Sequence, residues 1–300
     1  MGFQWFVRDK FCGWVSQDLS LPDGLTTEAS SVSSLKGAET LLDCELRNIY
    51  RAPLRRGDQL LSCFFYFFRH NSLRQLLGSG PPFHVLRMSE ALREQGFASL
   101  EVLAALRPKR QILGWTSLLI ASEIHSVFEL PSVGTHVYQI HKWIDFDESV
   151  ASELAGELAR FHDCAFFHGD LKSRHILTRT ASTAISGEGT SRFVLVDLEK
   201  TKRMPHLPSP ARDSLAARDL IQLLCSLPAG TELDEVQQAR DHFLDEYLKR
   251  RSISSRRARF IGKILELYDP GGVLVQGKTV LGGLTAHLRR KSAKSVSYTH

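Results

Sequence analysis

The chain reads FHGDLKSRHIL at residues 167–177 and FVLVDLEK at residues 193–200. The first stretch is typical of a tight polar loop that enters a short apolar strand, and the second of a buried strand that ends on an acid. Two acids, Asp170 and Asp197, therefore each lie at the edge of an apolar run. Neither stretch alone is decisive, but in this order and behind an amphipathic helix they predict one shared site.

A pair of carboxylates in this order is what phosphoryl transfer requires. One carboxylate accepts or orients the proton of the attacking hydroxyl, and the other holds Mg²⁺ against the nucleotide phosphates. We therefore interpret Asp170 and Asp197 as a kinase-like site or a decayed copy of one. The structural alternative is that Asp170 caps a turn and Asp197 only ends a strand.

The composition is that of an ordinary globular chain, with 43% hydrophobic and 24% charged residues among 300, and it excludes general disorder. The net charge of +5 is concentrated late in the chain and indicates an anionic partner, such as a nucleotide, a phospholipid or a nucleic acid. The five cysteines are scattered and include no Cys-x-x-Cys pair. We expect them to be reduced, mostly buried thiols without a zinc site.

The first residues are apolar too briefly for a signal peptide, because charged residues follow from Arg8 onward. The longest apolar run, around residues 60–68, has about half the length that spans a bilayer. We therefore expect a cytoplasmic protein.

Residues 29–51 are expected to form antiparallel strands, with Val32 and Leu35 in one strand and a turn that starts at Lys36. A kinase-like small lobe supplies a cation for the nucleotide phosphates from such a sheet. Arg47 is the nearest candidate and Lys36 the second. No Gly-x-Gly-x-x-Gly motif is present, so any turn that covers the phosphates lacks those glycines.

Residues 54–80 are rich in aromatic, leucine and basic side chains, and we expect a helix or a helix pair there. One interpretation is core packing beneath the small lobe. The other is a surface that dips into a membrane interface, with the aromatic run at 63–68 in the acyl boundary and arginines near anionic headgroups. These arginines are Arg55, Arg56, Arg69 and Arg74.

Helices are predicted wherever apolar residues recur at helical spacing. They cover residues 81–96, 149–164, 210–227, 232–251 and 256–268. Two strands are predicted at 100–106 and 117–122. The first helix offers Glu90 as the acid that pairs with the strand cation, and Glu123 marks the hinge that would bind adenine. Asp219 stands where a kinase-like fold anchors its catalytic loop, with a solvated helix acid as the alternative.

Four regions are predicted to be polar and accessible. Residues 178–191 are rich in Ser, Thr, Ala and Gly and are expected to form a mobile hairpin tip. Basic runs at 249–251 and 256–259 are interpreted as solvated faces, with binding of an anionic substrate or membrane as the alternative. The tail at 289–300 is basic and predicted to be disordered. The predicted domains are a nucleotide-binding lobe at 1–123, a catalytic lobe at 124–288 and this tail.

The motifs together resemble the lipopolysaccharide kinase (Kdo/WaaP) family, bacterial kinase-fold enzymes that phosphorylate sugars of the lipopolysaccharide inner core. The resemblance is clearest from Leu118 to Leu224, and the segments 171–177 and 196–200 are particularly similar to the InaA-like members. Three details favour this family over protein kinases. The loop has His-Gly-Asp in place of His-Arg-Asp, His175 replaces the expected Asn, and the metal motif is Asp-Leu-Glu-Lys in place of Asp-Phe-Gly.

The resemblance implies an α+β, two-lobed protein-kinase-like fold with a small antiparallel β lobe and a larger, mostly helical lobe. It implies that Asp170 is the general base or hydroxyl-orienting acid, that Lys172 contacts the transferring phosphate and that Asp197 is the main Mg²⁺ ligand. Glu123 would mark the adenine hinge. His175 would replace the second metal ligand, but Mg²⁺ prefers oxygen donors, so a contact to Asp170 or to a phosphate is the alternative.

The function that the resemblance implies is an ATP- and Mg²⁺-dependent kinase that phosphorylates a sugar hydroxyl, on heptose or Kdo, of a lipid-linked acceptor. It would work in the cytoplasm, peripherally at the inner face of the inner membrane and near anionic lipid, with no nucleic-acid partner. The strand lysine and its partner glutamate of protein kinases are not evident. The alternative is therefore a catalytically weak or inactive pseudokinase that binds nucleotide or acts as a scaffold.

Overall fold

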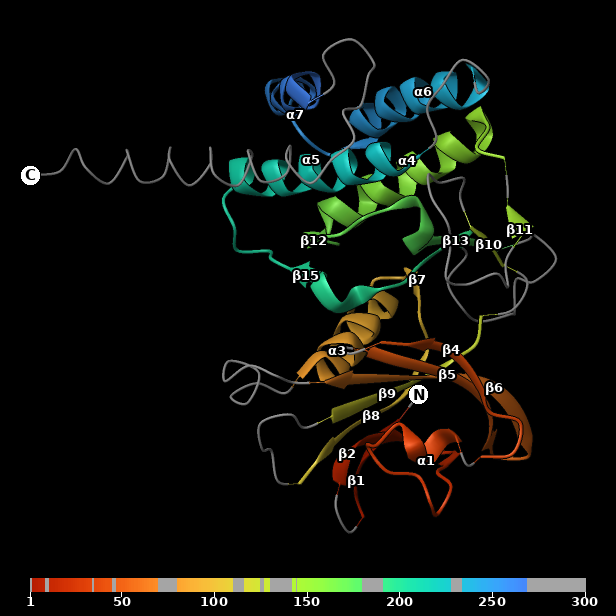
Figure 1. Ribbon diagram of the computed structural model, residues 1–300. Coiled ribbons are helices and arrows are strands. Elements are labelled where there is room, and N and C mark those ends of the chain that lie inside the picture. The colour runs from red at the N-terminus through yellow and green to blue at the C-terminus, as the bar shows by residue number, and fades with distance from the viewer. Residues whose placement is uncertain are drawn as a thin grey trace, which may run out of the picture.

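The computed structural model describes residues 2–8, 11–33, 35–44, 47–69, 80–109, 116–124, 127–129, 142–143, 145–179, 191–227 and 234–268. A curled sheet forms one half of the molecule and a group of packed helices forms the other (Figure 1). The predicted division into a small antiparallel β lobe and a larger, mostly helical lobe is confirmed. The predicted domain boundary at residue 123 stays a prediction, and the tail at 289–300 lies outside the described residues.

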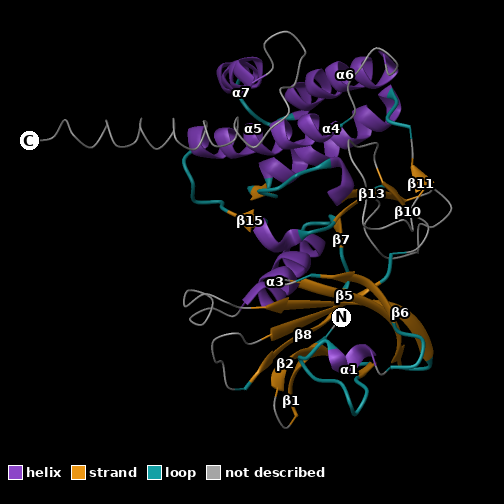
Figure 2. Ribbon diagram, in the orientation of Figure 1, coloured by secondary structure: helices purple, strands orange, loops and turns teal. Residues whose placement is uncertain are grey.

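The small lobe is an eight-stranded antiparallel sheet in which β4 pairs with β5 and the other strands follow the order β1-β2-β8-β9-β6-β5-β3. Helix α3 (Gly80–Glu94) packs on one face, and its apolar residues join those of the sheet in the core (Figure 2). The strands are β1 (Phe3–Arg8), β2 (Phe11–Ser16), β3 (Leu19–Ser20), β4 (Glu39–Asp43), β5 (Arg47–Arg56), β6 (Gln59–Arg69), β8 (Val102–Pro108) and β9 (Thr116–Ser122).

The prediction of a helix within residues 54–80 is wrong for the central part of this segment, which forms strand β6. A two-residue turn at Gly57 and Asp58 joins β6 to β5, and β6 also pairs with β9. A central strand is buried on both faces, so it reads as a continuous apolar run without the alternation that identifies a strand. Phe65 and Phe67 are fully buried. The aromatic run therefore packs in the core, and the membrane-surface alternative for it is wrong.

A second difference concerns Val32, which was expected in a strand. It lies in the short helix α1 (Ser30–Ser33) and is fully buried against the sheet. Side chains there bond the local backbone, since the hydroxyl of Ser31 donates to the carbonyl oxygen of Glu28 and accepts from the N–H of Thr26. Such bonds compete with strand pairing. The turn at Lys36 consequently joins a helix to β4, not two strands.

The helical lobe confirms the remaining predicted helices. Helix α4 begins after an Asp147 side chain that caps the N–H of Val150, and α5 carries a proline in its first turn, where no N–H is needed. The helices are α4 (Glu148–Asp163), α5 (Ser209–Ser226), α6 (Asp234–Arg250) and α7 (Ser255–Tyr268). Within the described residues, no helix has both the length and the apolar character needed to cross a membrane.

Two small sheets complete the helical lobe. Strands β12 (Phe166–Phe167) and β15 (Lys202–Arg203) pair antiparallel. A five-stranded sheet has the order β11-β10-β13-β14-β7 and includes β13 (Ile176–Arg179) and β14 (Phe193–Leu195), which flank the predicted hairpin tip. Its other strands are β7 (Ala98–Ser99), β10 (Val127–Glu129) and β11 (Lys142–Trp143). Because β7 follows α3 in the chain, its parallel pairing with β14 ties the two lobes together.

The basic run at 249–251 is only partly a solvated face. Arg251 is buried and contacts Asp163 and Asp213, and Arg257 makes a bidentate pair with Asp213. These residues are structural, since a buried charge needs a partner of opposite sign. The expectation of mostly buried cysteines is also wrong, because Cys12 and Cys63 are buried whereas Cys44 and Cys225 are exposed.

The close pairing of β2 and β8 depends on Gly13, so we expect Gly13→Ala to destabilise the protein by about 1–3 kcal/mol, the usual range for overpacking. A Cβ at Gly13 would lie 2.0 Å from the carbonyl oxygen of Ala105 and 2.8 Å from Cα of Leu106, both in β8. The measurement is the midpoint of urea unfolding.

The matched control is Gly262→Ala, which adds the same methyl group to α7. Apart from the helix's own backbone, no atom of the described residues lies within 4 Å of it. We expect it to raise stability by up to about 1 kcal/mol, because alanine favours the helix over glycine. A Gly13→Ala midpoint equal to that of the wild type would contradict the close approach of β2 and β8.

Candidate active site

The loop that carries Asp170 is held by one buried carboxylate on α5. Asp219 accepts the backbone N–H of His168 at 2.6 Å on Oδ2 and that of Gly169 at 2.9 Å on Oδ1. Asp219 is 1% exposed, so water does not compete for these charge-assisted bonds. The solvated alternative for Asp219 is therefore wrong, and the contact is the one expected of a loop anchor.

Two further residues of α5 hold the same loop and were not identified from the sequence. The side-chain oxygen of Gln222 accepts the N–H of Leu171 at 3.2 Å, and the hydroxyl of Ser226 accepts the N–H of Ser173 at 2.7 Å. Together with Asp219 they are spaced three and four residues apart, so they lie on one face of α5. Polar residues with this helical spacing, in a helix that follows the polar loop in the chain, are the signal that could have revealed them.

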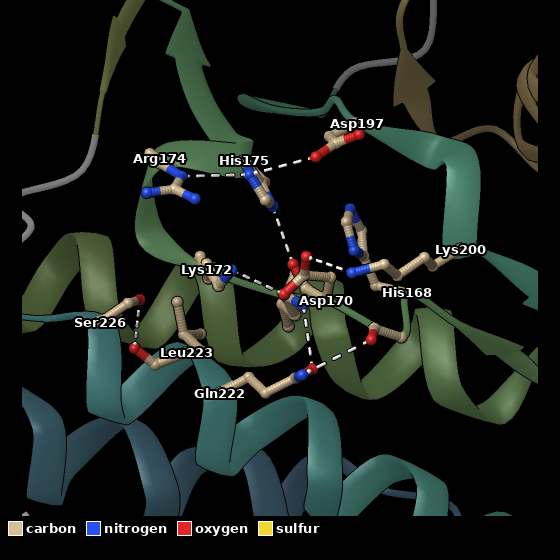
Figure 3. A network of polar contacts seen from close by, with 12 residues as sticks. His168, Asp170, Lys172, Arg174, His175, Asp197, Lys200, Gln222, Leu223 and Ser226 are labelled. Carbon is tan, nitrogen blue, oxygen red and sulfur yellow. Dashed lines mark hydrogen bonds and ion pairs between the residues drawn. The ribbon is translucent and has the colours of Figure 1, made fainter. Parts of the chain in front are cut away.

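Asp170 is clamped between two ammonium groups (Figure 3). Its Oδ1 lies 2.8 Å from Nζ of Lys172 and its Oδ2 lies 2.8 Å from Nζ of Lys200. Burial opposes ionisation of the carboxyl, but the two lysines outweigh it and hold the pKa of Asp170 well below its usual range. Asp170 is consequently ionised at neutral pH. Lys200 was part of the quoted motif, but its contact with Asp170 was not predicted.

His175 lies between the two acidic motifs. Its Nδ1 is 2.8 Å from the carbonyl oxygen of Asp170, and its Nε2 is 3.4 Å from Oδ2 of Asp197 (Figure 3). A carbonyl oxygen only accepts, so Nδ1 carries the hydrogen. Burial lowers the pKa of His175 to about 4, so the ring is neutral at pH 7 and its Nε2 presents a lone pair. Arg174 donates its Nε–H to that nitrogen at 3.3 Å.

Backbone contacts bring Asp197 to this place. The N–H of Val196 donates to the carbonyl oxygen of His175 at 3.0 Å, and the ring of His168 contacts the carbonyl oxygen of Val196 at 2.9 Å. Asp197 then adopts a left-handed conformation with φ of 57°, which aspartate tolerates better than most residues. The structure therefore brings Asp170, Lys172, His175 and Asp197 together.

The small lobe contributes one cation to this cluster. Arg47 forms an ion pair with Glu199 and lies over the ring of Phe68, 5.1 Å from its centroid. Burial raises the pKa of Glu199, and the charge of Arg47 opposes this effect. Glu199 is two residues after Asp197, so the ion pair links β5 directly to the metal motif. Glu199, not the predicted Glu90 of α3, is the acidic partner of Arg47.

The structure does not bring Lys36 to the cluster. Lys36 is exposed and precedes Gly37, which packs beside Pro53. Pro53 lies about 20 Å further along β5 than Arg47, at about 3.4 Å per residue. This distance separates Lys36 from the motifs, so Arg47 is the better candidate for the phosphate cation.

Glu123 is buried immediately after β9 and points into the small lobe. Its backbone N–H donates to the carbonyl oxygen of Ser62 at 2.8 Å, and its carboxylate lies 3.4 Å from a guanidinium nitrogen of Arg51. Arg51 also pairs with Glu39 on β4. The side chain thus stabilises the start of the link between the lobes, and binding of adenine there stays a prediction.

The donor atoms at Asp197 fit a magnesium ion only in part. Asp197 offers a partly exposed carboxylate, the oxygen ligand that Mg²⁺ prefers. The lone pair of His175 Nε2 faces the same carboxylate, but an imidazole is a poor ligand for Mg²⁺. Among the residues that the structure describes, no three His, Cys, Asp or Glu side chains gather into a metal-binding group. Asp197 therefore suits the metal, and His175 suits a positioning role.

The chain matches one protein-family model and partly resembles two solved structures. Residues 34–247 match the model of the lipopolysaccharide kinase (Kdo/WaaP) family. A solved structure of WaaP in complex with acyl carrier protein is 16% identical, with a TM-score of 0.48, and the match covers 79% of this chain and 91% of that one. A solved Rio2 kinase–ADP/Mg²⁺–phosphoaspartate complex from Chaetomium thermophilum is 14% identical, with a TM-score of 0.40, and the match covers 76% of this chain and 69% of that one.

Among the curated proteins, no sequence matches the chain. The family match extends over both lobes, from the turn before β4 to the end of α6. With the loop, the metal motif and the small-lobe cation in the arrangement described above, the predicted protein-kinase-like fold is confirmed. The chain belongs to the lipopolysaccharide kinase (Kdo/WaaP) family.

Proposed function

We propose that this protein is an ATP- and Mg²⁺-dependent kinase that transfers phosphate to a sugar hydroxyl, on heptose or Kdo, of the lipopolysaccharide inner core. The observation that carries the proposal is the position of His175 between the two acidic motifs: its Nδ1–H donates to the backbone carbonyl of Asp170, and its ring lies 3.4 Å from the carboxylate of Asp197. Family membership supports the reaction class. The short separation of the two motifs supports one site that uses both acids.

In this proposal Asp170 orients the attacking hydroxyl. Its lowered pKa makes it a weak base, so it accepts a hydrogen bond from the hydroxyl and takes the proton late in the reaction. That order suits phosphoryl transfer, whose transition state is loose and demands little from a base. Positioning and charge neutralisation then supply most of the rate acceleration.

The two lysines have separate tasks. Each carboxylate oxygen of Asp170 contacts one ammonium group and keeps a second lone pair that can accept a hydrogen bond from the hydroxyl. Lys172 is 33% exposed and is the candidate that turns to the transferring phosphate, whereas Lys200 is 65% exposed and keeps the carboxylate in place. An exposed pair contributes about 1 kcal/mol or less, so exchanging one partner for a phosphate is easy.

The nucleotide would lie between Asp197 and Arg47. A Mg²⁺ ion held by Asp197 would neutralise charge on the phosphates. Arg47 stays bonded to Glu199 and still has other N–H groups to donate, because a guanidinium offers five. It can therefore bind phosphate without giving up its acidic partner, which a lysine does less well.

The acceptor would be lipid-linked, and the protein would contact the inner face of the inner membrane peripherally. The net charge of +5 supports an anionic partner. Adenine would bind next to Glu123, and no nucleic acid takes part. The membrane-contacting surface is not the aromatic run of β6, because those side chains are buried.

A second candidate is a nucleotide-binding protein of the same fold without turnover. Two observations favour it: Arg47 pairs with Glu199 and not with an acid on α3, and His175 stands where an oxygen ligand for a second metal ion is expected. Both could leave nucleotide bound in a geometry that does not react.

Asp170→Asn and Asp197→Asn are each expected to lower phosphate transfer by about 10²–10⁴-fold, because each removes a charge that the reaction uses. The assay follows γ-phosphate transfer to core oligosaccharide taken from cells that lack this gene. Thermal-shift titration with ATP and Mg²⁺ separates the roles: Asp170→Asn should keep the stabilisation by ligand and Asp197→Asn should lose it.

The control Asp245→Asn makes the same change at an exposed position of α6 and should behave as the wild type. Turnover that persists in either active-site variant would exclude the assigned roles. Stabilisation of the wild type by nucleotide without transfer to any core sugar would favour the non-catalytic candidate.

Arg47→Met is expected to weaken nucleotide binding about tenfold or more, because a hydrogen bond to a charged group contributes about 1.5–3 kcal/mol. The control Arg55→Met removes an exposed arginine from the same strand and should leave the dissociation constant of ATP unchanged. Equal affinities of the two variants, measured by calorimetry, would remove Arg47 from the nucleotide site.

A further inference from the structure

A line of buried polar side chains leads from the end of α6 to the loop that carries Asp170. It runs from Arg251 through Tyr247 and His162 to Asp219, and these four residues are 5%, 0%, 1% and 1% exposed. They come from three helices, α4, α5 and α6, that lie side by side in the helical lobe (Figure 1), and from the residue that follows α6. Buried polar groups destabilise a fold unless they are bonded, so the contacts along this line need a structural reason.

The near end of the line touches the loop anchor. Nε2 of His162 lies 3.5 Å from Oδ2 of Asp219, the same oxygen that accepts the N–H of His168. The ring of His162 also stacks on Phe167, with centroids 5.8 Å apart and planes 17° from parallel. His162 therefore contacts both the residue that holds the loop and the residue that precedes it.

At the other end of the line, Arg251 determines which groups donate and which accept in the hydrogen bonds of Tyr247 and His162. Arg251 Nη1 lies 2.5 Å from the hydroxyl of Tyr247, which lies 2.7 Å from Nδ1 of His162. A guanidinium only donates, so the tyrosine oxygen accepts from Arg251. Burial raises the pKa of Tyr247 and lowers the pKa of His162. The phenol therefore keeps its hydrogen, the imidazole is neutral, and the O–H of Tyr247 donates to Nδ1.

This direction determines the tautomer of His162. A neutral imidazole that accepts at Nδ1 carries its hydrogen on Nε2. That nitrogen lies 3.5 Å from Oδ2 of Asp219, an electrostatic contact longer than a hydrogen bond. The other tautomer would point a lone pair at the carboxylate and would leave the hydroxyl of Tyr247 without its acceptor. Two unfavourable contacts thus separate the tautomers among side chains that are buried.

We propose that Tyr247 is a positioning residue for the active-site loop: its hydroxyl, held by Arg251, fixes the His162 tautomer whose N–H faces Asp219 and so keeps both oxygens of Asp219 on the loop amides. Neither Tyr247 nor His162 would touch the substrate. Removing the hydroxyl releases the tautomer, turns a lone pair toward Asp219 and loosens the backbone at His168 and Gly169.

Tyr247→Phe tests the proposal without any assay of turnover. In the wild type, nitrogen-15 imidazole spectra should show His162 as the Nε2–H tautomer, and in the variant as the Nδ1–H tautomer or a mixture. Hydrogen exchange at the amides of His168 and Gly169 should become faster in the variant. Tyr50→Phe, which removes a hydroxyl from a buried tyrosine of the small lobe, is the matched control and should change neither measurement.

The activity readout rests on the proposed function. Tyr247→Phe should lower kcat about ten- to a hundredfold, the usual effect of misplacing a catalytic group from a distance, and leave KM for the nucleotide unchanged. A merely destabilised protein would lose active molecules in proportion to the unfolded fraction, which circular dichroism measures. If the wild type shows no turnover, the proposed function fails, and the tautomer and exchange results still decide the inference.

A second variant keeps the test decisive if Tyr247→Phe folds poorly. His162→Gln places an amide N–H near the position of Nε2, and its donor does not depend on Tyr247. In a protein that already carries His162→Gln, adding Tyr247→Phe should not further accelerate hydrogen exchange at the amides of His168 and Gly169. The effects of the two substitutions should therefore be non-additive. A wild-type His162 protonated on Nδ1 alone, or exchange at the loop amides that is unaltered by loss of the hydroxyl, would overturn the proposal.

Discussion

Hydrogen bonds between two backbone segments bring the acidic motifs of this protein together. Strands β13 and β14 pair from Ile176 opposite Leu195, and the ladder continues to the bond between Val196 and His175. His175 and Asp197 are therefore neighbours for a reason that does not depend on side-chain attraction. Two carboxylates repel each other in a medium of low dielectric constant, so a rigid backbone is needed to hold Asp170 and Asp197 around a common histidine.

Charge balance explains why the cluster is stable before any ligand binds. Three carboxylates, on Asp170, Asp197 and Glu199, face the four cations Lys172, Arg174, Lys200 and Arg47. Asp170 and Glu199 are paired with cations, whereas Asp197 lies beside the neutral His175, so the cluster has more cations than carboxylates. The two lysines and Arg47 are thus oriented in advance by the acids of the chain, and under the proposed function less reorganisation would be required when phosphate charge develops.

The sequence analysis correctly predicted the helices and strands in which apolar residues recur at a single regular spacing. Helix α4 was expected at 149–164 and is found at Glu148–Asp163, because one face is buried and the other is not. Strand β6 was missed because both of its faces are buried, which removes the period. The short helix α1 was missed because its side-chain bonds to the backbone are local and leave no pattern.

The same limit applies to the candidate site. The quoted loop and metal motif identified Asp170 and Asp197, since both sit in contiguous stretches with a known chemical use. The partners of Arg47 and Asp170 are set by how the lobes pack, and no spacing in the chain encodes them. Arg251 looked like part of a solvated basic run, yet it is buried, because Asp163 and Asp213 lie far from it in sequence and close to it in space.

The two sides of the site differ in how firmly they are held. On the helical side, Asp219 makes two charge-assisted bonds inside the core, each of a kind that contributes about 1.5–3 kcal/mol. On the small-lobe side, the pair of Arg47 with Glu199 is partly exposed, where an ion pair contributes about 1 kcal/mol or less. The loop of Asp170 is therefore held more firmly on α5 than the small lobe is held to the site. Under the proposed function, this difference would let the small lobe adjust to a nucleotide while Asp170, the group proposed to orient the acceptor, stays in place.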